Sequence, residues 1–306
     1  MEATDPISAA AALKRGGLVI MPTETVYGLA ADARNTQAVM AVFEAKGRPS
    51  FNPLIVHVTG IEAARQVAQV DVRAKVLAQR FWPGPLTLVL PLANPNAVSH
   101  WVVAGLDTVA VRAPAHPLSR ALLEEFGGPV VAPSANRSGR PSPTTFAAAM
   151  EETGPSAAAA LDGGPCEVGL ESTVLALLDK PRLLRPGAIT RSQIEAVIGP
   201  LAEAEADAKR SPGRMARHYA PELPVRLNVE SPEPGEAYLA FGPARHDRLF
   251  QLSETRNLPE AAANLFAHLR AADRSGARGI AVAPIPTDGL GEAINDRLKR
   301  AAGFVG

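Results

Sequence analysis

The sequence predicts an α/β protein of two domains, the first with a mixed sheet and flanking helices. The chain has 306 residues, 46% of them apolar, so it is too long for one small domain and can form a sizeable core. Short β-branched apolar runs alternate with segments of helical period over the first 200 residues, which is typical of α/β domains. The amino-acid composition changes near residue 200. We expect a first domain over residues 1–200, a linker over 201–224 and a small α/β domain over 225–306.

The strands expected in the first domain are short runs of Val, Ile, Leu and other apolar residues. They are residues 18–21, 54–58, 86–90, 109–111, 130–132, 174–178 and 182–184. The last two follow each other with only a few residues between them. Because so short a connection joins antiparallel neighbours, the sheet is expected to be mixed and not purely parallel.

Helices are expected between several of these strands, where apolar residues recur at helical spacing. They are residues 37–45, 61–67, 118–126, 146–152 and 192–198. Thr190 and Gln193 have the spacing of a capping box at the start of the last one.

The last third of the chain reads as a linker and a small Rossmann-like domain. Residues 201–209 are rich in Ala and Glu, and residues 211–221 carry turn residues without periodicity, so this stretch is interpreted as a linker. Beyond it, the expected strands are residues 237–241 and 279–283, and the expected helices are residues 258–272 and 291–302.

Composition excludes several classes of protein. Lys plus Arg and Asp plus Glu both total 31, so no net charge draws the chain to nucleic acid or to a membrane surface. Cys166 is the sole cysteine, which excludes an internal disulfide and a cysteine-rich metal site. The first residues lack the pattern of a signal peptide, and no apolar run approaches the ~18 residues of a membrane span. We expect a cytoplasmic protein.

The common nucleotide and hydrolase motifs are missing. The sequence has no Walker-type loop, no Gly-x-Gly-x-x-Gly after a first strand, no His-Glu-x-x-His and no Gly-x-Ser-x-Gly. A phosphate-binding site in this chain must therefore use a less common motif.

Polar residues instead gather at the ends of predicted elements, beginning with residues 22–29. This stretch holds small hydroxyls and a carboxylate after an apolar run. Lys46 and Arg48 then stand one residue apart beside Gly and Pro, which suits a bound anion, and a second apolar run ends on His57. His57 alone would more often be a core or edge histidine.

Residues 132–145 form a second candidate site between a strand and a helix. Ser142 is a plausible N-cap with Pro143 at the first helical position, and a helix N-terminus can hold an anion. An ordinary polar loop with a capped helix explains this segment as well. Taken with the other polar ends, however, it favours one large polyanion site; those ends are Thr23/Thr25, Lys46/Arg48/Asn52/His57, Thr108/Arg112, Ser134/Asn136 and Ser172/Arg185.

At these residues the chain resembles the threonylcarbamoyl-AMP synthase family, the YrdC-type domain in its long two-domain form. The matching motifs are residues 22–29, 46–49 with 52–54, 81–88, 105–112, 132–136, 169–174 and 184–187. Residues 211–213, 218–221 and 293–298 are similar to the linker and C-terminal domain of the long form. Residues 214–216 depart from the pattern by lacking a linker lysine.

The resemblance implies a fold and a reaction. The fold is a twisted mixed sheet around a concave, positively lined cleft. The reaction forms threonylcarbamoyl-adenylate and pyrophosphate from L-threonine, bicarbonate or CO2, and ATP, with Mg2+ accompanying ATP and no metal site on the protein. The product serves threonylcarbamoyl-adenosine modification of tRNA, so the implied partners are downstream tRNA-modifying transferase proteins and, weakly, tRNA itself.

The resemblance also implies roles for single residues. Lys46 and Arg48 would stabilise the leaving pyrophosphate and are the expected catalytic pair. Arg112 would hold the carboxylate of threonine by a fork contact, and Tyr219 would close over the cleft as part of a lid. The remaining threonine-side residues are Thr25, His57, Ser134 and Ser172, and the remaining ATP-side residues are Asn52, Thr108, Asn136, Thr144 and Arg185.

Two other functions stay open on the residues alone. A basic cleft could bind folded RNA without catalysis, although the neutral net charge and the lack of a run of aromatic residues disfavour this. The domain could also be a carbamoyl-transfer accessory that acts on carbamoyl phosphate. The absence of acylphosphatase-like or zinc-finger-like extensions disfavours this function.

Overall fold

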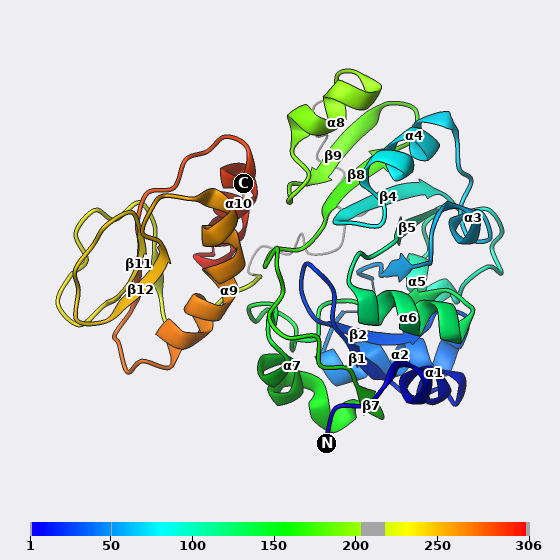
Figure 1. The fold of residues 1–306 in the computed structure, drawn as a ribbon, viewed down its shortest axis with the longest axis horizontal. Helices are drawn as coiled ribbons and strands as arrows, with labels where there is room; N and C mark the ends of the chain where they lie inside the picture. The colour runs from blue at the N-terminus through cyan, green and yellow to red at the C-terminus, as the bar shows by residue number, and fades with distance from the viewer. Residues whose placement is uncertain (1, 50, 203–217, 304–306) are drawn as a thin grey trace.

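The computed structural model describes residues 2–49, 51–202 and 218–303, which form two sheets (Figure 1). The larger sheet has nine strands in the order β7-β1-β2-β6-β3-β5-β4-β8-β9, and the smaller has four in the order β10-β13-β11-β12. Parallel and antiparallel pairs mix in the larger sheet, whereas the three pairs of the smaller sheet are all parallel. The α/β class with a mixed first sheet and a small second α/β unit is thereby confirmed.

The elements of the first unit alternate along the chain. Its strands are β1 (Val19–Met21), β2 (Gly28–Asp32), β3 (Ile55–His57), β4 (Leu86–Pro91), β5 (Thr108–Arg112), β6 (Val130–Val131), β7 (Ala159–Ala160), β8 (Thr173–Leu177) and β9 (Pro181–Arg185). Its helices are α1 (Pro6–Lys14), α2 (Thr36–Lys46), α3 (Ile61–Ala64), α4 (Val72–Phe81), α5 (His100–Val103), α6 (Pro117–Phe126), α7 (Phe146–Thr153), the short 3-10 helix η1 (Gly154–Ser156) and α8 (Arg191–Ile198).

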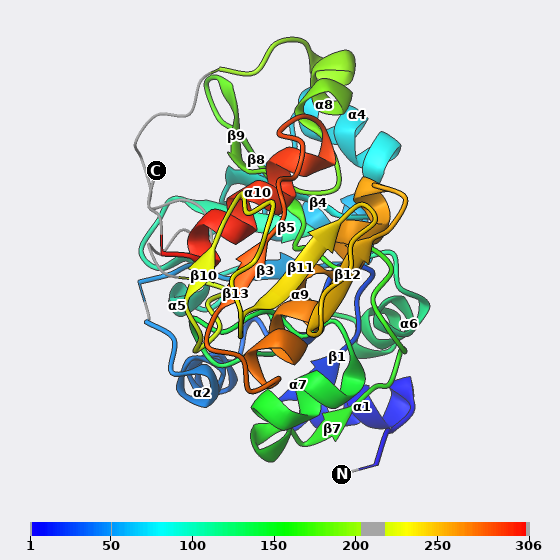
Figure 2. The same cartoon turned by 90° about the vertical axis from the view of Figure 1, so that its left-hand side faces the viewer.

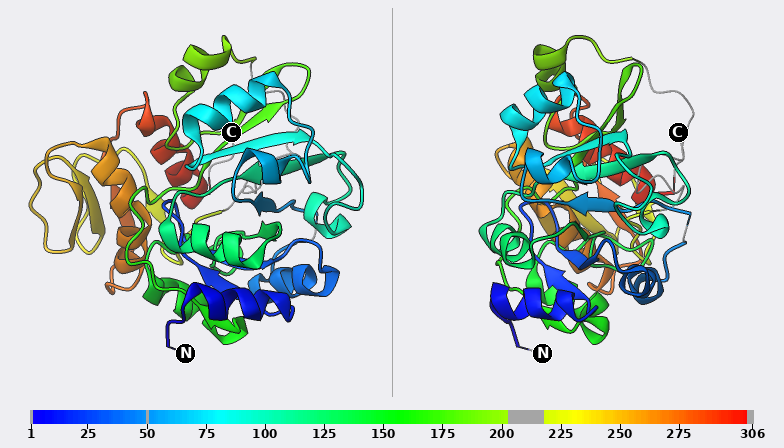
Figure 3. Two further views of the ribbon diagram at one scale, coloured as in Figure 1. Left: turned by 45° about the vertical axis from the view of Figure 1, so that its right-hand side comes forward. Right: turned by 90° about the vertical axis from the view of Figure 1, so that its right-hand side faces the viewer.

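Helices cover both faces of the larger sheet because its strands are apolar on both sides. Val19 and Met21 of β1 pack in one core cluster with α1 and α6, whereas Ile20 between them packs in another with α2 and α5. This is the two-residue alternation of a strand. At the far end of the sheet α4 packs against α8 (Figure 3).

The second unit is a parallel sheet covered on the inner side by two helices. Its strands are β10 (Val225–Arg226), β11 (Ala237–Phe241), β12 (Leu249–Ser253) and β13 (Ile280–Val282), and its helices are α9 (Leu258–Asp273) and α10 (Leu290–Ala301). Figure 2 shows this sheet face on, and Figure 1 shows α9 and α10 between it and the first unit. The core of the second unit also contains Val26 and Leu170 from the first.

One backbone crossing fixes how closely the two units approach. Gly169 has φ +71, and a Cβ built on it would lie 2.5 Å from the Cα of Ala263 in α9. Only glycine combines this conformation with so close a contact, so the loop before β8 can rest directly on α9.

Most predicted elements are confirmed within one or two residues, and the capping box at Thr190 and Gln193 is present. The prediction of Ser142 as a helix N-cap is wrong. Helix α7 begins at Phe146, its N-cap is Thr145, and the Ser142 hydroxyl donates to Glu171 instead. The domain boundaries stay a prediction, and most of the expected linker lies outside the described residues. In the part of the chain that the structure describes, no helix is long and apolar enough to cross a membrane.

Candidate functional site

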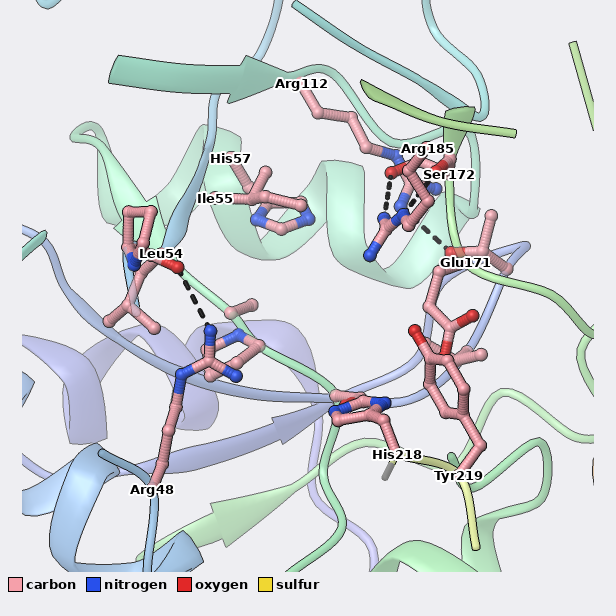
Figure 4. A pocket seen from close by; sticks show the side chains of 16 residues that line it. Arg48, Leu54, Ile55, His57, Arg112, Glu171, Ser172, Arg185, His218 and Tyr219 are labelled. Carbon is pink, nitrogen blue, oxygen red and sulfur yellow. Dashed lines mark hydrogen bonds between the residues drawn. The ribbon is translucent and has the colours of Figure 1, made fainter. Parts of the chain in front are cut away.

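A pocket lies at the ends of several elements of the larger sheet (Figure 4). Its polar side chains come from three loops, which follow β1, α2 and β6, and from the last residues of β3, β5 and β9. Others come from the two residues before β8 and from residues 218 and 219. These lining residues are Thr25, Arg48, His57, Arg112, Ser134, Glu171, Ser172, Arg185, His218 and Tyr219. Segments far apart in sequence therefore meet at one cavity.

Arg112, the last residue of β5, is buried in a network of hydrogen bonds. Its Nη2 donates to the Glu24 carboxylate at 2.5 Å, its Nη1 to the Thr25 hydroxyl at 2.9 Å and its Nε to the Gly84 carbonyl at 3.2 Å. Burial opposes the charge on Glu24, but the charge of Arg112 outweighs it and lowers the pKa of this carboxyl. The ion pair keeps Arg112 in one orientation at the pocket wall.

His57 closes β3 as a neutral imidazole. Burial, helped by the charge of Arg112, lowers its pKa to about 3, and its Nδ1 has no hydrogen-bond partner among the described residues. A buried nitrogen without a partner is costly, so this ring offers the pocket a group that a polar ligand can satisfy.

Ser172 also lines the pocket, and its hydroxyl is oriented from two sides. Its hydroxyl is 2.7 Å from that of Thr87 in β4, and Arg185 donates to it from Nη2 at 3.1 Å. Arg185 also donates from Nε to the Ser172 carbonyl at 3.0 Å, so the end of β9 is bonded to the start of β8.

Arg48 reaches the pocket from the side opposite Arg112 and Arg185 (Figure 4). Its Nη2 donates to the Pro53 carbonyl at 3.1 Å, and its buried Nε has no partner in the described part of the chain. Burial, with the charge of Arg185, lowers the pKa of Arg48 to about 10, which leaves it charged at neutral pH. A charged group with an unused donor in a cavity is suited to an anionic ligand.

Lys46 does not line the pocket. Its ammonium donates to the carbonyls of Ser134 and Asn136, and burial, with the charge of Arg48, lowers its pKa well below the ordinary value. The lysine at the end of α2 thus fixes the loop after β6, whose residue Ser134 does line the pocket.

His218 and Tyr219 cover the cavity from the segment that leads to the second unit. Both are buried; their rings meet edge to face with centroids 3.9 Å apart, and Tyr219 has φ +60. Burial lowers the pKa of His218 to about 3 and raises that of Tyr219 to about 12. Both rings are therefore neutral near pH 7.

Four of the predicted ATP-side residues lie off the pocket wall. Thr108 is at the other end of β5 from Arg112, where it pairs with Pro91. Asn136 donates to the carbonyls of Arg137 and Arg140, and the carbonyl of Asn52 accepts from Arg48 at 3.4 Å. Thr144 lines a separate groove between α7 and α9.

Sequence reasoning assigned no role to Glu24, Glu171 or His218. The first two stand inside motifs that the sequence analysis used, at residues 22–29 and 169–174, so their position was visible but their pairing was not. Glu171 accepts a hydrogen bond from Ser142 at 2.5 Å and one from Arg297 of α10 at 2.9 Å.

The residues around the pocket are suited to an anion and not to a metal ion. Three guanidinium groups line it, and both nearby carboxylates, Glu24 and Glu171, are already paired with arginine. Over the described ranges no group of three or more His, Cys, Asp or Glu could hold a metal ion. A Mg2+ ion in this pocket would be held by the phosphates of a nucleotide, as is usual for this ion.

The chain is similar to known proteins over almost its full length. The family model described as "Telomere recombination" matches residues 11–187, and that described as "Threonylcarbamoyl-AMP synthase, C-terminal domain" matches residues 189–303. Threonylcarbamoyl-AMP synthase of Bacillus subtilis (strain 168) is 43% identical over 96% of this chain and 92% of its own length.

One solved structure and one shorter relative add detail. The crystal structure of Pyrococcus abyssi Sua5 complexed with L-threonine has a TM-score of 0.90 and 40% identity, covering 98% of this chain and 94% of that one. A putative threonylcarbamoyl-AMP synthase of Mycobacterium tuberculosis (strain ATCC 25618 / H37Rv) is 40% identical over 63% of this chain and 88% of its own length.

Proposed function

Because the chain belongs to the Sua5-type threonylcarbamoyl-AMP synthase family, we propose that the pocket lined by Arg48, Arg112 and Arg185 forms the bond between threonylcarbamate and AMP. The chain is an enzyme, a threonylcarbamoyl-AMP synthase, as its motifs predicted. The observation that carries the assignment to this pocket is the cavity itself, where three guanidinium groups face a space whose carboxylates are already neutralised.

The substrates are L-threonine, bicarbonate or CO2, and ATP. The neutral amine of threonine adds to CO2 to give a carbamate and a proton. A carbamate oxygen then attacks the α-phosphorus of ATP, the bond to the β-phosphate oxygen breaks, and pyrophosphate leaves. Both reactants are anions, so the main tasks of the site are to offset their repulsion and to hold them in line.

The threonine side of the pocket is the wall formed by Arg112, His57 and Ser172. Arg112 would bind the carboxylate of threonine with the N–H groups that Glu24, Thr25 and Gly84 do not use. His57 and the hydroxyls of Thr25, Ser134 and Ser172 would hold its amine and hydroxyl. The L-threonine bound in the crystal structure of the Pyrococcus abyssi relative supports a threonine site in this fold.

The ATP side would be served by Arg48 and Arg185. Arg48 has an unused Nε donor for a phosphate oxygen, and Arg185 is oriented by Ser172 at the opposite wall. Lys46 would act through the loop that it fixes, because its ammonium is bonded to Ser134 and Asn136. Asn52, Thr108, Asn136 and Thr144 stay predictions as ATP contacts, and Tyr219 stays a prediction as part of a lid.

Mg2+ would enter as a complex with ATP. When bound it would offset charge on the departing phosphates, and Arg48 and Arg185 would do the same from the protein side. The product serves threonylcarbamoyl-adenosine modification of tRNA. Transfer to partner proteins, weak contact with tRNA and a cytoplasmic location remain predictions.

The test is pyrophosphate release by the purified chain with Mg2+ and ATP, with and without L-threonine and bicarbonate. Release that requires both is the expected result, and threonylcarbamoyl-adenylate should be found by mass spectrometry. Release that ignores threonine would contradict the proposal. Binding of RNA in the absence of any release would favour the RNA-binding alternative.

A further inference from the structure

The second unit has a cavity of its own, which we call the C-terminal groove. Its volume is about 620 Å³, and it shares no lining residue with the pocket of the first unit. Most of its lining comes from the carboxyl ends of β11 and β13 and from the loops that follow β11, β12 and β13. The lining residues are Glu230, Tyr238, Phe241, Pro243, Arg256, Ala283, Pro284, Ile285 and Pro286.

The groove lies where two neighbouring strands send the chain to opposite faces of the sheet. β11 pairs in parallel with β13 (Figure 2). After β11 the chain passes over the outer face, where Ala244 packs against the cluster that holds Tyr238 and Ala281. After β13 the chain enters α10, which packs on the inner face in the cluster that holds Leu239 and Val282. Open α/β sheets bind ligands in the crevice that forms at such a point, outside the carboxyl ends of the strands.

Arg256, in the loop between β12 and α9, is the cation of the C-terminal groove. In the described part of the chain its guanidinium has no hydrogen bond and no ion pair. Its backbone has φ +60, a left-handed conformation that a residue other than glycine seldom adopts. Its Nε lies 2.6 Å from the place that a Cβ would take on Gly242, so the side chain rests on the end of β11. An arginine without a protein partner, in a strained loop beside a cavity, is suited to an anionic ligand.

The rest of the lining indicates which kind of anion fits. Most lining residues are aromatic or proline, and such surfaces pack well against a flat ring. Glu230 is the carboxylate among them. It would repel a bare anion, but it can accept hydrogen bonds from hydroxyl groups. A nucleotide has all three complementary parts, namely a flat base, the ribose hydroxyls and a phosphate.

We propose that the C-terminal groove is a second ligand site, which binds a mononucleotide with its phosphate on Arg256 and its base against the aromatic and proline residues. The ribose hydroxyls donate to Glu230, the contact that an acidic residue makes in many nucleotide sites of α/β sheets. The proposal does not depend on the function proposed for the first pocket. It gives the second unit a binding role of its own.

The experiment is photolabelling of the full chain with 8-azido-AMP, followed by mass spectrometry of the labelled peptides. AMP can also enter the first pocket, so the position of the label separates the two sites. The variants are Arg256→Met, which removes the charge, and Arg256→Lys, which keeps it. The control is Arg278→Met, which removes an exposed arginine of the same unit that pairs with Glu233. Thermal melting reports the folded fraction of each variant, and pyrophosphate release reports the first pocket.

We expect a labelled peptide from residues 230–243 or 283–286. Excess AMP should block this labelling, whereas inorganic phosphate or adenosine at the same concentration should not, because each lacks part of the ligand. Arg256→Met should weaken binding of the probe there by about 10-fold or more, the scale of one hydrogen bond to a charged group. Arg256→Lys should weaken it by about 3-fold or less. Arg278→Met should match the wild type, and no variant should change KM for ATP.

Three outcomes would overturn the proposal. One is labelling confined to the first unit. Another is labelling of the C-terminal groove that Arg256→Met leaves unchanged, which would remove this arginine from the site. The third is labelling that inorganic phosphate blocks as well as AMP does, which would mean a site for an anion without a base. Failure of the wild type to release pyrophosphate would contradict the function proposed for the first pocket instead and would leave the labelling result standing.

Discussion

Arg112 uses three of its five N–H groups inside the protein, for Glu24, Thr25 and Gly84. One N–H is left on each terminal nitrogen, and a carboxylate can accept both. Glu24 has a second role, because its other oxygen accepts from the backbone N–H of Ala115 at 3.0 Å. The Glu24 carboxylate thus connects the loop after β1 to the end of β5, and it also orients Arg112.

Arg112→Lys should weaken threonine binding about 100-fold, because an ammonium cannot serve the three protein acceptors and a forked carboxylate together. KM for ATP should change only a few-fold. The measurement is the titration of threonine by calorimetry together with both KM values, and Arg120→Lys on the exposed face of α6 is the control. An unchanged affinity for threonine would remove Arg112 from the threonine site.

The buried histidines predict how stability depends on pH. His57 has a pKa of about 3 in the folded protein and an ordinary value near 6.5 when unfolded, so between these pH values the unfolded chain binds more protons. Stability conferred by neutral His57 is therefore present above about pH 6.5 and is lost as pH falls, by about 2 kcal/mol at pH 5. His218 behaves in the same direction.

The measurement is urea unfolding of the wild type and of His57→Gln at pH 7.5 and pH 5. The variant should lose less stability on acidification than the wild type, by about 2 kcal/mol. Exposed His100→Gln is measured in parallel as a control. Equal losses for the wild type and His57→Gln would show that His57 is protonated in the folded state.

Residue types predicted the pocket better than they predicted the pairing within it. Arginines and hydroxyls at element ends stood out because such ends meet in α/β folds. Glu24 and Glu171 did not, because an acidic residue in an anion site looks unfavourable until its arginine partner is known. The role of Lys46 at the phosphates stays a prediction, and its hydrogen bonds to two carbonyls of the loop after β6 are a pairing that no spacing reveals.

At the scale of elements, the crossing of Gly169 over α9 leaves no room for a side chain. Gly169→Ala adds a methyl group 2.5 Å from the Ala263 Cα and also strains a φ of +71. Gly127, which ends α6, has the same φ of +71, but no atom lies within 4 Å of the place that a Cβ would take there. Gly127→Ala therefore carries only the strain of the backbone.

We expect Gly127→Ala to cost about 1 kcal/mol and Gly169→Ala to cost at least about 2 kcal/mol more, since backbone atoms cannot yield as a flexible side chain can. Urea unfolding of both variants measures the difference. Similar losses for the two would show that the loop before β8 can move away from α9 at little cost.

Several elements that were not predicted from the sequence lack a clear pattern of apolar and polar residues. β2 (Gly28–Asp32) consists of small residues and Leu29, and β12 (Leu249–Ser253) mixes polar and apolar residues at an edge of its sheet. α4 carries exposed Val72 and Val76 on its outer face, which blurs its period. Strands buried on both faces, such as β4, were predicted correctly because their apolar runs are continuous.

At the scale of the molecule, two sheets share one core at their boundary. Leu170, in the loop before β8, is fully buried among residues of α9 and α10, and Val26 joins the same cluster. Ion pairs from Arg270 to Glu152 and from Arg274 to Glu151 border this contact. None of this is readable from sequence, because periodicity shows that a residue is buried but not which unit covers it.

This shared core predicts that the two units unfold together. Both tryptophans, Trp82 and Trp101, lie in the first unit, so their fluorescence reports its unfolding, whereas circular dichroism reports both. In the wild type the two urea transitions should coincide. Leu170→Ala should lower the free energy of unfolding by about 2–4 kcal/mol. Because it removes a contact between the units, it should also move the dichroism transition to a lower urea concentration than the fluorescence transition.

Leu175→Ala is the matched control, since Leu175 is as buried as Leu170 but packs within the first unit alone. It should lower both transitions together. Separate transitions in the wild type would contradict the shared core. Coincident transitions in the Leu170 variant would mean that the ion pairs at the boundary suffice to couple the units, and the dependence of that variant on salt would then be steeper than that of the wild type.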